Sequence, residues 1–451
     1  MDLKGKHVLI LGLARSGIAA AMELISLGAK VTASDMKSRE ELEDTAFLES
    51  RGVRLVCGGH PLTLLNKCDL IVLSPGVPSD LEILDEARKR DISVISELEL
   101  GYRFAKAPII AVTGTNGKTT TTTLIGEILK NDGRNITLAG NIGIPLVREV
   151  EKAENKDYLV VEVSSFQLEN IMHFKPKISV ILNITEDHLN RHKTFENYIK
   201  AKARILENQT EEDYAVLNYD DPIARSFVKR IKPKIMFFSQ KEELIRGIYV
   251  KNGVIVIREN GKIYPILKAG ELGIKGSHNL ENALAAVCVA WIARINLNNM
   301  AETLKDFHGV EHRLEFVANI AGVKFINDSK ATNPDAAQKA IEALKEPIVL
   351  IAGGYDKKSD YSSFVKAFNE KVKHLILIGD TAQAIESTAR KSGFVDVEKS
   401  NSLQEAVKLA YNRAAPGDVV LLSPACASWD MFESFEERGR IFKETVHSLK
   451  G

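Results

Sequence analysis

Short runs of consecutive apolar residues recur along this chain, and each ends in a glycine or a polar loop. Residues 7–11, 109–113 and 348–352 are examples, and segments with helical periodicity lie between such runs. Strands that are apolar on both faces are typical of parallel sheets covered by helices on both sides. The pattern therefore predicts an α/β fold of doubly wound domains, in which ligands bind at the carboxyl ends of the strands.

A length of 451 residues corresponds to about three domains of roughly 150 residues each. We place the boundaries where one series of strands and helices ends and the next begins, which gives domains at residues 1–107, 108–312 and 313–451. Residues 248–267 depart from the parallel pattern, since Asn252-Gly253 and Asn260-Gly261 separate alternating runs. Asn-Gly in this setting is a strong hairpin signal, so we expect a small antiparallel meander at the edge of the central sheet.

Charge and apolarity exclude several classes of protein. The 60 lysines and arginines are balanced by 60 acidic residues, which argues against a nucleic-acid partner. No apolar run approaches the ~18 residues of a membrane span, and the first residues lack the layout of a signal peptide. The four cysteines form no C-x-x-C pair, which favours a reducing, cytoplasmic compartment. Because the sequence has no heptad repeat, we expect a monomer. Because it has no long apolar run, we expect no association with membranes.

The sequence Gly-Thr-Asn-Gly-Lys-Thr-Thr at residues 114–120 follows one predicted strand and begins a helix. Glycines let the backbone aim its N–H groups at phosphate oxygens, and the helix N-terminus adds positive potential. A lysine such as Lys118 can reach the β- and γ-phosphates, and the Thr119 hydroxyl can bind Mg²⁺. The strict phosphate-loop pattern has a further glycine where Val112 stands, so we expect a variant of that loop.

A second glycine turn, Gly12-Leu13-Ala14-Arg15-Ser16-Gly17, resembles a dinucleotide fingerprint with alanine at its second glycine. Asp35 ends the next predicted strand, where a ribose-binding acid often lies. Three interpretations stay open: NAD binding, binding of a single nucleotide's diphosphate, and a purely structural turn. The loop at 74–78, stiffened by two prolines, lies at another strand end and can form a wall of the same site.

Three further segments of the central domain carry polar groups at strand or helix ends. Glu162 ends an apolar run, and its carboxylate needs either a metal ion or a lysine partner. His188 follows another strand and is suited to metal or phosphate contacts. Asn279 and Asn282 share a helix face and can bind a base edge, although N-capping by Ser277 or Asn279 is the alternative.

The third domain gathers cations, hydroxyls and helix starts at three predicted strand ends, within residues 327–334, 353–358 and 423–428. This combination predicts a site for a carboxylate. Arg313, at the preceding domain junction, is suited to a bidentate phosphate contact.

Together these motifs resemble the Mur ligases, the ATP-dependent amide ligases of peptidoglycan precursor synthesis. The resemblance extends from Gly12 to Gly439. The segments at 114–120, 278–282 and 311–313 resemble the whole family, whereas the loop at 74–78 and the segments at 328–333 and 423–428, with Phe432 and Phe435, resemble its D-glutamate-adding branch.

The resemblance implies an N-terminal Rossmann-like domain for a UDP-sugar, a central P-loop-type ATPase domain and a C-terminal Rossmann-like α/β domain for an amino acid. It implies that ATP phosphorylates the carboxylate of UDP-N-acetylmuramoyl-L-alanine and that D-glutamate attacks the resulting acyl phosphate. Two Mg²⁺ ions and a lysine carbamylated by CO₂ are also implied. From the residues alone, Lys202 belongs to a helical pattern whose cations favour a solvated face.

The resemblance assigns roles residue by residue. The implied catalytic residues are Lys118, Glu162, His188, Lys202 and Arg313. The implied metal ligands are Thr119, Glu162, His188 and carbamylated Lys202. The implied ATP contacts are Gly114, Thr115, Asn116, Gly117, Lys118, Thr119, Thr120, Asn279, Asn282, Arg313 and Asp328. The implied UDP-substrate contacts are Arg15, Ser16, Asp35, Lys37, Ser74, Gly76, Asn141, Ser164 and Gln167. The implied D-glutamate contacts are Lys330, Thr332, Lys357 (or its neighbour Lys358), Ser428 and Phe435.

Other functions compete with this interpretation. Another Mur ligase or a folylpolyglutamate-type ligase would use the same ATP loop, but the latter does not need the first domain's nucleotide fold. An NAD-dependent oxidoreductase would use Gly12–Gly17 and leave the loop at 114–120 unexplained. A nucleotide-binding switch without ligase activity would leave the third domain's polar cluster without a role.

Overall fold

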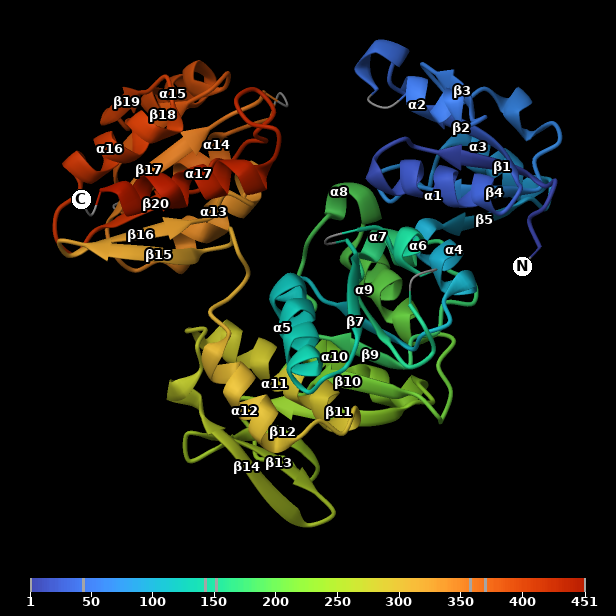
Figure 1. Ribbon diagram of the computed structural model, residues 1–451, viewed down its shortest axis with the longest axis horizontal. Helices are drawn as coiled ribbons and strands as arrows, with labels where there is room; N and C mark the ends of the chain where they lie inside the picture. The colour runs from blue at the N-terminus through green and yellow to red at the C-terminus, as the bar shows by residue number, and fades with distance from the viewer. Residues whose placement is uncertain are drawn as a thin grey trace. The chain divides into compact units, whose positions relative to one another are not determined.

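The computed structural model describes residues 2–42, 45–141, 144–150, 153–356, 359–368 and 371–449. The chain divides into two compact units, Met1–Phe307 and His308–Gly451. Three sheets, each flanked by helices, make up these units (Figure 1). The α/β fold class expected from the apolar runs is confirmed. None of the described helices combines the length and apolarity needed to cross a bilayer.

The first sheet is parallel throughout, in the order β3-β2-β1-β4-β5. Its strands are β1 (His7–Leu11), β2 (Lys30–Asp35), β3 (Arg54–Cys57), β4 (Leu70–Leu73) and β5 (Ser93–Ser96). Its helices are α1 (Arg15–Ser26), α2 (Thr45–Ser50), α3 (Glu82–Lys89) and α4 (Glu97–Phe104). Apolar clusters cover both faces of this sheet, as the doubly buried strand pattern predicts.

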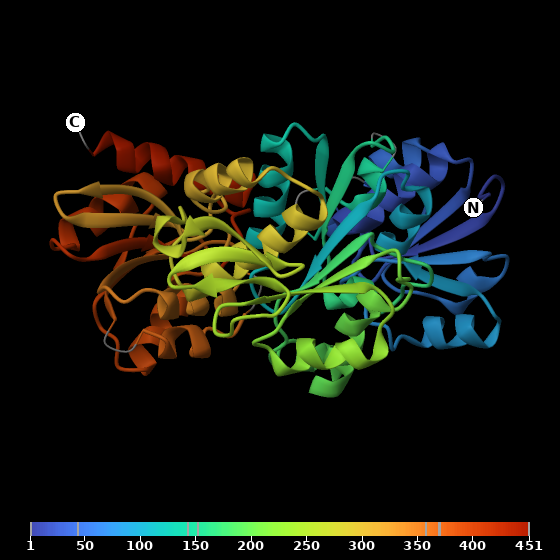
Figure 2. The same cartoon turned by 90° about the horizontal axis from the view of Figure 1, so that it is seen from below.

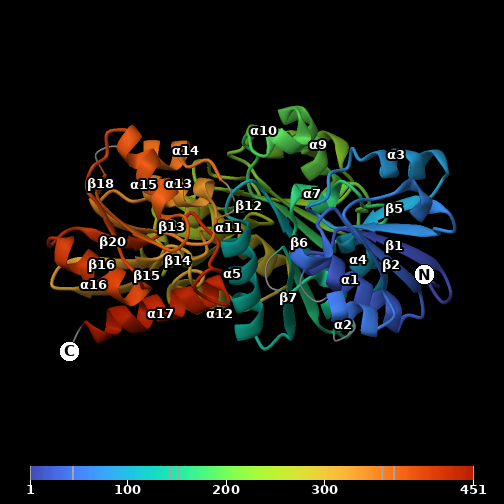
Figure 3. The same ribbon diagram turned by 90° about the horizontal axis from the view of Figure 1, so that it is seen from above.

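The central sheet has the order β14-β13-β12-β11-β10-β9-β6-β8-β7. Its strands are β6 (Ile109–Thr113), β7 (Ile136–Gly140), β8 (Tyr158–Glu162), β9 (Ile178–Ile181), β10 (Tyr214–Asn218), β11 (Lys234–Ser239), β12 (Gly247–Lys251), β13 (Val254–Glu259) and β14 (Lys262–Lys268). Its helices are α5 (Lys118–Asn131), α6 (Leu146–Glu149), α7 (Ser165–Leu168), α8 (Leu189–His192), α9 (Phe195–Ala203), α10 (Pro222–Ser226), α11 (Ser277–Ile292) and α12 (Leu297–Asp306). Figure 3 shows α5 and α9 on opposite sides of the central strands.

The predicted antiparallel meander is confirmed as β12, β13 and β14 at one edge of this sheet; it is the yellow-green ribbon in Figure 2. Both residues of each Asn-Gly turn have positive φ, with Asn252 at 48° and Asn260 at 51°. Left-handed backbone at both central positions is what a type I′ hairpin requires. The turn residues therefore determine the direction change that the sequence predicts.

The third sheet has the order β15-β16-β20-β17-β18-β19, and β15 runs antiparallel to β16. Its strands are β15 (Glu315–Ile320), β16 (Val323–Asn327), β17 (Ile348–Gly353), β18 (Val372–Ile378), β19 (Val397–Lys399) and β20 (Val419–Leu422). Its helices are α13 (Pro334–Ala343), α14 (Ser362–Lys366), α15 (Ala382–Lys391), α16 (Leu403–Arg413) and α17 (Phe435–Ser448). The sequence analysis did not find β15, because the Ala321-Gly322 turn that joins it to β16 lacks a strong hairpin signal.

Two acidic residues at the start of α4 tie the first sheet to the central one within the first unit. Glu97 accepts a hydrogen bond from the backbone N–H of Val147 in α6 (2.8 Å), and its Oε2 is buried without a hydrogen-bond partner. Glu99 accepts from the N–H groups of Met172, His173 and Phe174. Burial raises the pKa of Glu97 to about 7, so folding favours its protonated form.

This shift predicts how stability depends on pH. Because the folded-state pKa of Glu97 is raised, its contribution is fully present below pH 4.5 and is lost as the pH rises through about 7. As the pH is raised from 5 to 8, wild type should therefore lose stability that Glu97→Gln keeps. The difference in free energy of unfolding between the two proteins should grow by about 2–3 kcal/mol in favour of the variant. Denaturant unfolding at both pH values measures this. Exposed Glu82→Gln is the control, and parallel curves for wild type and Glu97→Gln would contradict the prediction.

Candidate active site

The loop between β6 and α5 has the form of a phosphate cradle. Gly117 caps α5 in the left-handed region, at φ 81°, and a Cβ there would lie 2.2 Å from Asn282 Oδ1. Only glycine takes this backbone conformation readily and leaves the Asn282 side chain in place. Lys118 Nζ donates to the carbonyl oxygens of Gly114 (2.9 Å) and Thr115 (2.8 Å), which places its positive charge over the loop. A loop amine beside a helix N-terminus favours a bound phosphate.

Glu162, at the end of β8, is 2% exposed. Its Oε2 accepts from the Thr119 hydroxyl (2.8 Å), and its Oε1 accepts from the Asn141 side-chain amide (2.9 Å). The alternative expectation of a lysine partner for Glu162 is wrong, because a hydroxyl and an amide satisfy the carboxylate instead. Thr119, Asn141 and Glu162 thus meet at the phosphate loop.

Lys202 is the most unusual cation of the site, since it is 1% exposed. Its Nζ donates to the carbonyl of Gly114 (2.7 Å) and lies 4.7 Å from the centroid of the Tyr198 ring. Burial, and then the charge of Lys118, lowers the pKa of Lys202 well below its usual value. The solvated face expected from the residues alone is therefore wrong for Lys202. Tyr198, Ala201 and Lys202 form the buried face of α9, whereas Lys200 is exposed and paired with Glu196.

His188 lies in the segment between β9 and α8 with a left-handed backbone, at φ 52°. Its imidazole is half-exposed, lies 3.6 Å from Asp187 Oδ2 and packs on the ring of Phe166, with centroids 4.9 Å apart. Its neighbour His192 is buried and structural, since it contacts Ser165 Oγ (3.0 Å) and Glu169 Oε1 (3.3 Å). His188 is therefore the more exposed of the two histidines.

The described residues contain no group of three or more His, Cys, Asp or Glu placed to hold a metal ion. Mg²⁺ does not need such a cage, because it commonly keeps several waters and binds one or two carboxylates plus substrate phosphates. Glu162 and the Thr119 hydroxyl, 2.8 Å apart beside the loop, are hard oxygen donors of this kind. The residues present therefore fit a magnesium ion that also binds a nucleotide.

Asn282 and Asn279 lie next to the phosphate loop. The buried Asn282 accepts from the Thr121 hydroxyl (3.2 Å) and donates to Asn279 Oδ1 (3.2 Å). The residue that caps α11 is Gly276, which provides no side-chain cap hydrogen bond. N-capping by Ser277 or Asn279 is therefore wrong. Asn282 instead connects α11 to α5 at the cradle, and Asn279 holds the Asn282 amide.

The glycine turn of the first sheet is closed by side chains from two strand ends, those of β2 and β4. Asp35 accepts from the backbone N–H groups of Leu13 (2.7 Å) and Lys37 (3.0 Å), and the buried Ser74 donates to the Gly12 carbonyl (2.7 Å). A Cβ at Gly17 would lie 1.9 Å from Gly12 O. Backbone amides engage both oxygens of Asp35, so this carboxylate holds the turn closed while each oxygen keeps a further acceptor site.

The remaining predicted contacts of the UDP-substrate surround two helix starts. Arg15, Gly76 and Lys37 are exposed, and Ser16 is half-buried in the first turn of α1. Ser164 caps α7 by accepting from the N–H of Gln167, whose side chain accepts from Ser164 in return. Ser164 and Gln167 thus satisfy each other's hydrogen-bonding groups, and their capping box fixes the start of α7, just after the end of β8 at Glu162.

In the second unit, Asp328 follows β16 and is buried. It accepts from the Ser423 hydroxyl (2.7 Å) and from the N–H of Leu314 (3.2 Å), and burial raises its pKa to about 7. The neighbouring Arg313 is exposed. These contacts join the first residues of the unit to the ends of β16 and β20.

Four of the predicted D-glutamate contacts lie in the described part of the second unit. Lys330 Nζ is 5.9 Å from the centroid of the Phe435 ring, Ser428 is buried, and Thr332 is half-buried beside Lys330. Lys357 and its neighbour Lys358 lie outside the described residues. Sequence reasoning missed Arg438, which is buried among these loops, and Tyr198. The four-residue spacing of Tyr198 and Lys202 on one helix was the available signal for the latter.

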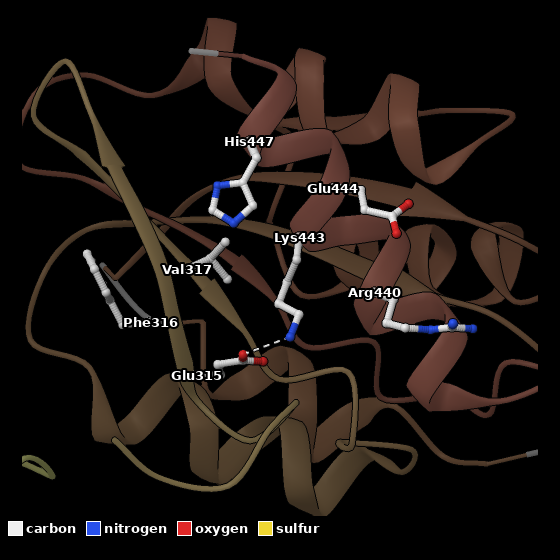
Figure 4. Close-up of a pocket in the computed structure, with 7 residues that line it drawn as sticks. All are labelled: Glu315, Phe316, Val317, Arg440, Lys443, Glu444 and His447. Carbon is white, nitrogen blue, oxygen red and sulfur yellow. Dashed lines mark hydrogen bonds and ion pairs between the residues drawn. The ribbon is translucent and has the colours of Figure 1, made fainter. Parts of the chain in front are cut away.

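A cavity of about 340 Å³ also lies in the second unit, between β15 and α17 (Figure 4). Its lining residues are Glu315, Phe316, Val317, Arg440, Lys443, Glu444 and His447. Lys443 and Glu315 form an ion pair of 3.0 Å across it. None of the predicted site residues lines this cavity, so it is separate from the loops described above.

Comparison with known proteins covers the whole chain. Residues 6–96 match the family described as Mur ligase MurD-like, N-terminal domain, residues 112–290 match the Mur ligase middle domain, and residues 312–426 match the Mur ligase, glutamate ligase domain. The UDP-N-acetylmuramoylalanine–D-glutamate ligases of Thermoanaerobacter pseudethanolicus and Clostridioides difficile are 56% and 45% identical to this chain, each over 100% of both chains.

Solved structures share the fold at lower identity. The UDP-N-acetylmuramate-alanine ligase MurC of Thermotoga maritima aligns with a TM-score of 0.57 at 22% identity, over 99% of this chain and 100% of its own. The MurF ligase of Thermotoga maritima, solved in complex with ADP, aligns with a TM-score of 0.56 at 18% identity, over 99% of this chain and 96% of its own. With three family domains in order and full-length relatives well above 30% identity, this chain belongs to the Mur ligase family.

Proposed function

We propose that this chain joins D-glutamate to UDP-N-acetylmuramoyl-L-alanine at the expense of ATP, the reaction for which its full-length relatives are named. The observation that carries this proposal is the meeting of Lys118, Thr119, Glu162 and Lys202 around one phosphate loop. That arrangement combines the ammonium of Lys118, the buried amine of Lys202, a hard-oxygen donor pair and a helix N-terminus. Phosphoryl transfer needs little more than such positioning and charge stabilisation.

The reaction has two steps. In the first, a carboxylate oxygen of the UDP-substrate attacks the γ-phosphorus of ATP; the new O–P bond forms as the bond to the bridging oxygen breaks, and ADP leaves. In the second, the amine nitrogen of D-glutamate attacks the carbonyl carbon of the acyl phosphate. The C–N bond forms, the C–O bond to phosphate breaks with its electron pair, and the amine loses a proton.

The residues of the loop supply the stabilisation for the first step. The backbone N–H groups of residues 114–120 and the ammonium of Lys118 face the phosphates, where negative charge shifts during transfer. Asn279 and Asn282, on α11, and Asp328 and Arg313, in the second unit, are the further nucleotide contacts of this proposal. Amides suit the base edge, and an arginine suits a phosphate.

Members of this family use ATP and require Mg²⁺. We assign the magnesium donors to Thr119, Glu162, His188 and a carbamylated Lys202, and infer two ions. When bound, Mg²⁺ offsets the phosphate charge and polarises the oxygen atoms that react. Asn141 and the capping box of α7 hold the Glu162 carboxylate and its strand end in place.

The surroundings of Lys202 support the proposed carbamylation. Its amine is buried against a carbonyl, and the described residues place no carboxylate within ion-pair distance of it. A buried ammonium in this position is costly, whereas a neutral amine is able to attack CO₂. The nitrogen bonds to the carbon of CO₂ and releases a proton, which replaces the cation with a carboxylate-like metal ligand.

The substrate carboxylates and the uridine nucleotide have separate contacts in this proposal. The UDP-substrate is held by the first sheet and the edge of the central one, through Arg15, Ser16, Asp35, Lys37, Ser74, Gly76, Asn141, Ser164 and Gln167. D-glutamate is held by the second unit, through Lys330, Thr332, Lys357, Ser428 and Phe435. The α1 N-terminus, which has no side-chain cap, suits the diphosphate.

We further propose functional domains at residues 1–107, 108–312 and 313–451, each built on one of the three sheets. The four cysteines are free thiols, which accords with a reducing cytoplasm, where we place the enzyme. We infer that it acts as a monomer, and sedimentation of the purified chain tests this.

The reaction itself is tested by phosphate release. With ATP, Mg²⁺ and UDP-N-acetylmuramoyl-L-alanine present, we expect release that depends on D-glutamate and not on L-glutamate or L-lysine. Release with another amino acid would assign the chain to a different branch of the family. No release with any amino acid would overturn the proposal.

Glu162→Gln tests the loop assignment. The substitution keeps the shape and the bond from Asn141 but removes the negative charge, so kcat should fall about 10²–10³-fold. Asn135→Ala, which removes only an exposed contact with Asp157, is the control with unchanged kcat. Steady-state rates at saturating Mg²⁺ measure both. A Glu162→Gln variant within threefold of wild type would contradict the assignment.

A further inference from the structure

Arg438, on α17, is the largest side chain that is fully buried in the described part of the chain. Its guanidinium donates through Nε to Ser329 Oγ (2.9 Å) and through Nη2 to the Ser329 carbonyl (2.8 Å). Nη1 donates to the carbonyls of Cys426 and Ala427, at 3.2 Å each. One side chain therefore holds two loops, one after β16 and one after β20.

A third strand end lies against the same guanidinium. A Cβ at Gly354, which follows β17, would lie 3.3 Å from Arg438 Nη1 and 2.3 Å from the Ala427 carbonyl. The backbone of Tyr355 donates to that same carbonyl (3.0 Å). Arg438 thus lies beneath three adjacent strand ends, and a larger residue at Gly354 would displace the arrangement.

The two bonded loops carry the proposed amino-acid contacts. Lys330 and Thr332 follow Ser329 directly, and Ser428 follows Ala427. Ser329 also donates from its hydroxyl to the Phe435 carbonyl (2.8 Å), which ties the start of α17 to the same point. The positions of Lys330, Ser428 and Phe435 relative to one another therefore depend on Arg438 and Ser329.

The charge of Arg438 is not neutralised by contact, since no carboxylate pairs with it among the residues that the structure describes. Asp430 and Asp328 act on it only through longer-range attraction, and burial lowers its pKa to about 10. The guanidinium therefore stays protonated at neutral pH. A buried charge that is bound only to hydroxyl and carbonyl oxygens is costly unless the geometry it fixes is needed.

We propose that Arg438 is a positioning residue for the incoming amino acid: its guanidinium fixes the loops that carry Lys330 and Ser428, and adds positive potential for a substrate with two carboxylates. This inference rests on the proposed function. Arg438 acts through the loops and makes no contact with the substrate.

The test is a split between kinetic constants. Arg438→Lys keeps the charge but loses the planar fork, so the loops lose their common anchor. We expect the KM for D-glutamate to rise about tenfold or more, with the KM for ATP and for the UDP-substrate within about threefold of wild type. Ser329→Ala is a milder change that removes the hydroxyl oxygen to which Arg438 Nε donates. It should also raise the KM for D-glutamate. If Arg438→Lys does not fold, the Ser329→Ala result decides whether the inference holds.

Phe442→Leu is the matched control, because Phe442 is buried on the same helix and belongs to the apolar core of this unit. It should lower the melting temperature and leave the KM for D-glutamate unchanged. An unchanged KM for D-glutamate in both loop variants, or equal changes in all three KM values, would overturn the inference. Wild-type enzyme is assayed first, because absence of D-glutamate-dependent phosphate release there would refute the proposed function instead.

Discussion

The contact between the Lys202 amine and the Gly114 carbonyl, 2.7 Å long, is the interaction on which the proposed site depends. It joins α9 to the first residue of the phosphate loop, and it buries the amine of a lysine side chain to do so. The loop in turn sets where Lys118 and the start of α5 point. If Lys202 were solvated, the loop would lose its hydrogen bond from α9 to Gly114, and the proposed magnesium site would lose one of its four donor residues.

The strand order of the central sheet explains why residues far apart in the sequence meet at the phosphate loop. β6 lies between β8 and β9, so the loop after β6 has Glu162 on one side and the segment leading to His188 on the other. Side chains at these three strand ends meet because parallel strands end at one edge. Buried carboxylate, hydroxyl and amine groups at that edge interact strongly, since little water screens them.

Much of this arrangement was predictable from the sequence. Continuous apolar runs predicted the parallel strands, two Asn-Gly turns predicted the meander, and the motif at residues 114–120 predicted the phosphate loop. Pairings between distant segments were not predictable. The burial of Lys202 depends on which face of α9 meets β6, and the partners of Glu162 depend on the order of β7, β8 and β6. Strand β15 was not predicted because its Ala-Gly turn is not a strong hairpin signal. The role of Arg438 was not predicted because periodicity alone does not show that an arginine is buried.

The most direct test of this account is whether Lys202 carries a carbamate. The protein would be equilibrated with ¹³C-bicarbonate, Mg²⁺ and ADP, and its carbonyl region compared by NMR with that of Lys202→Arg. The account predicts one additional carbonyl resonance in wild type that is absent in the variant, together with activity that falls when CO₂ is removed. Identical spectra, with activity independent of CO₂, would contradict it.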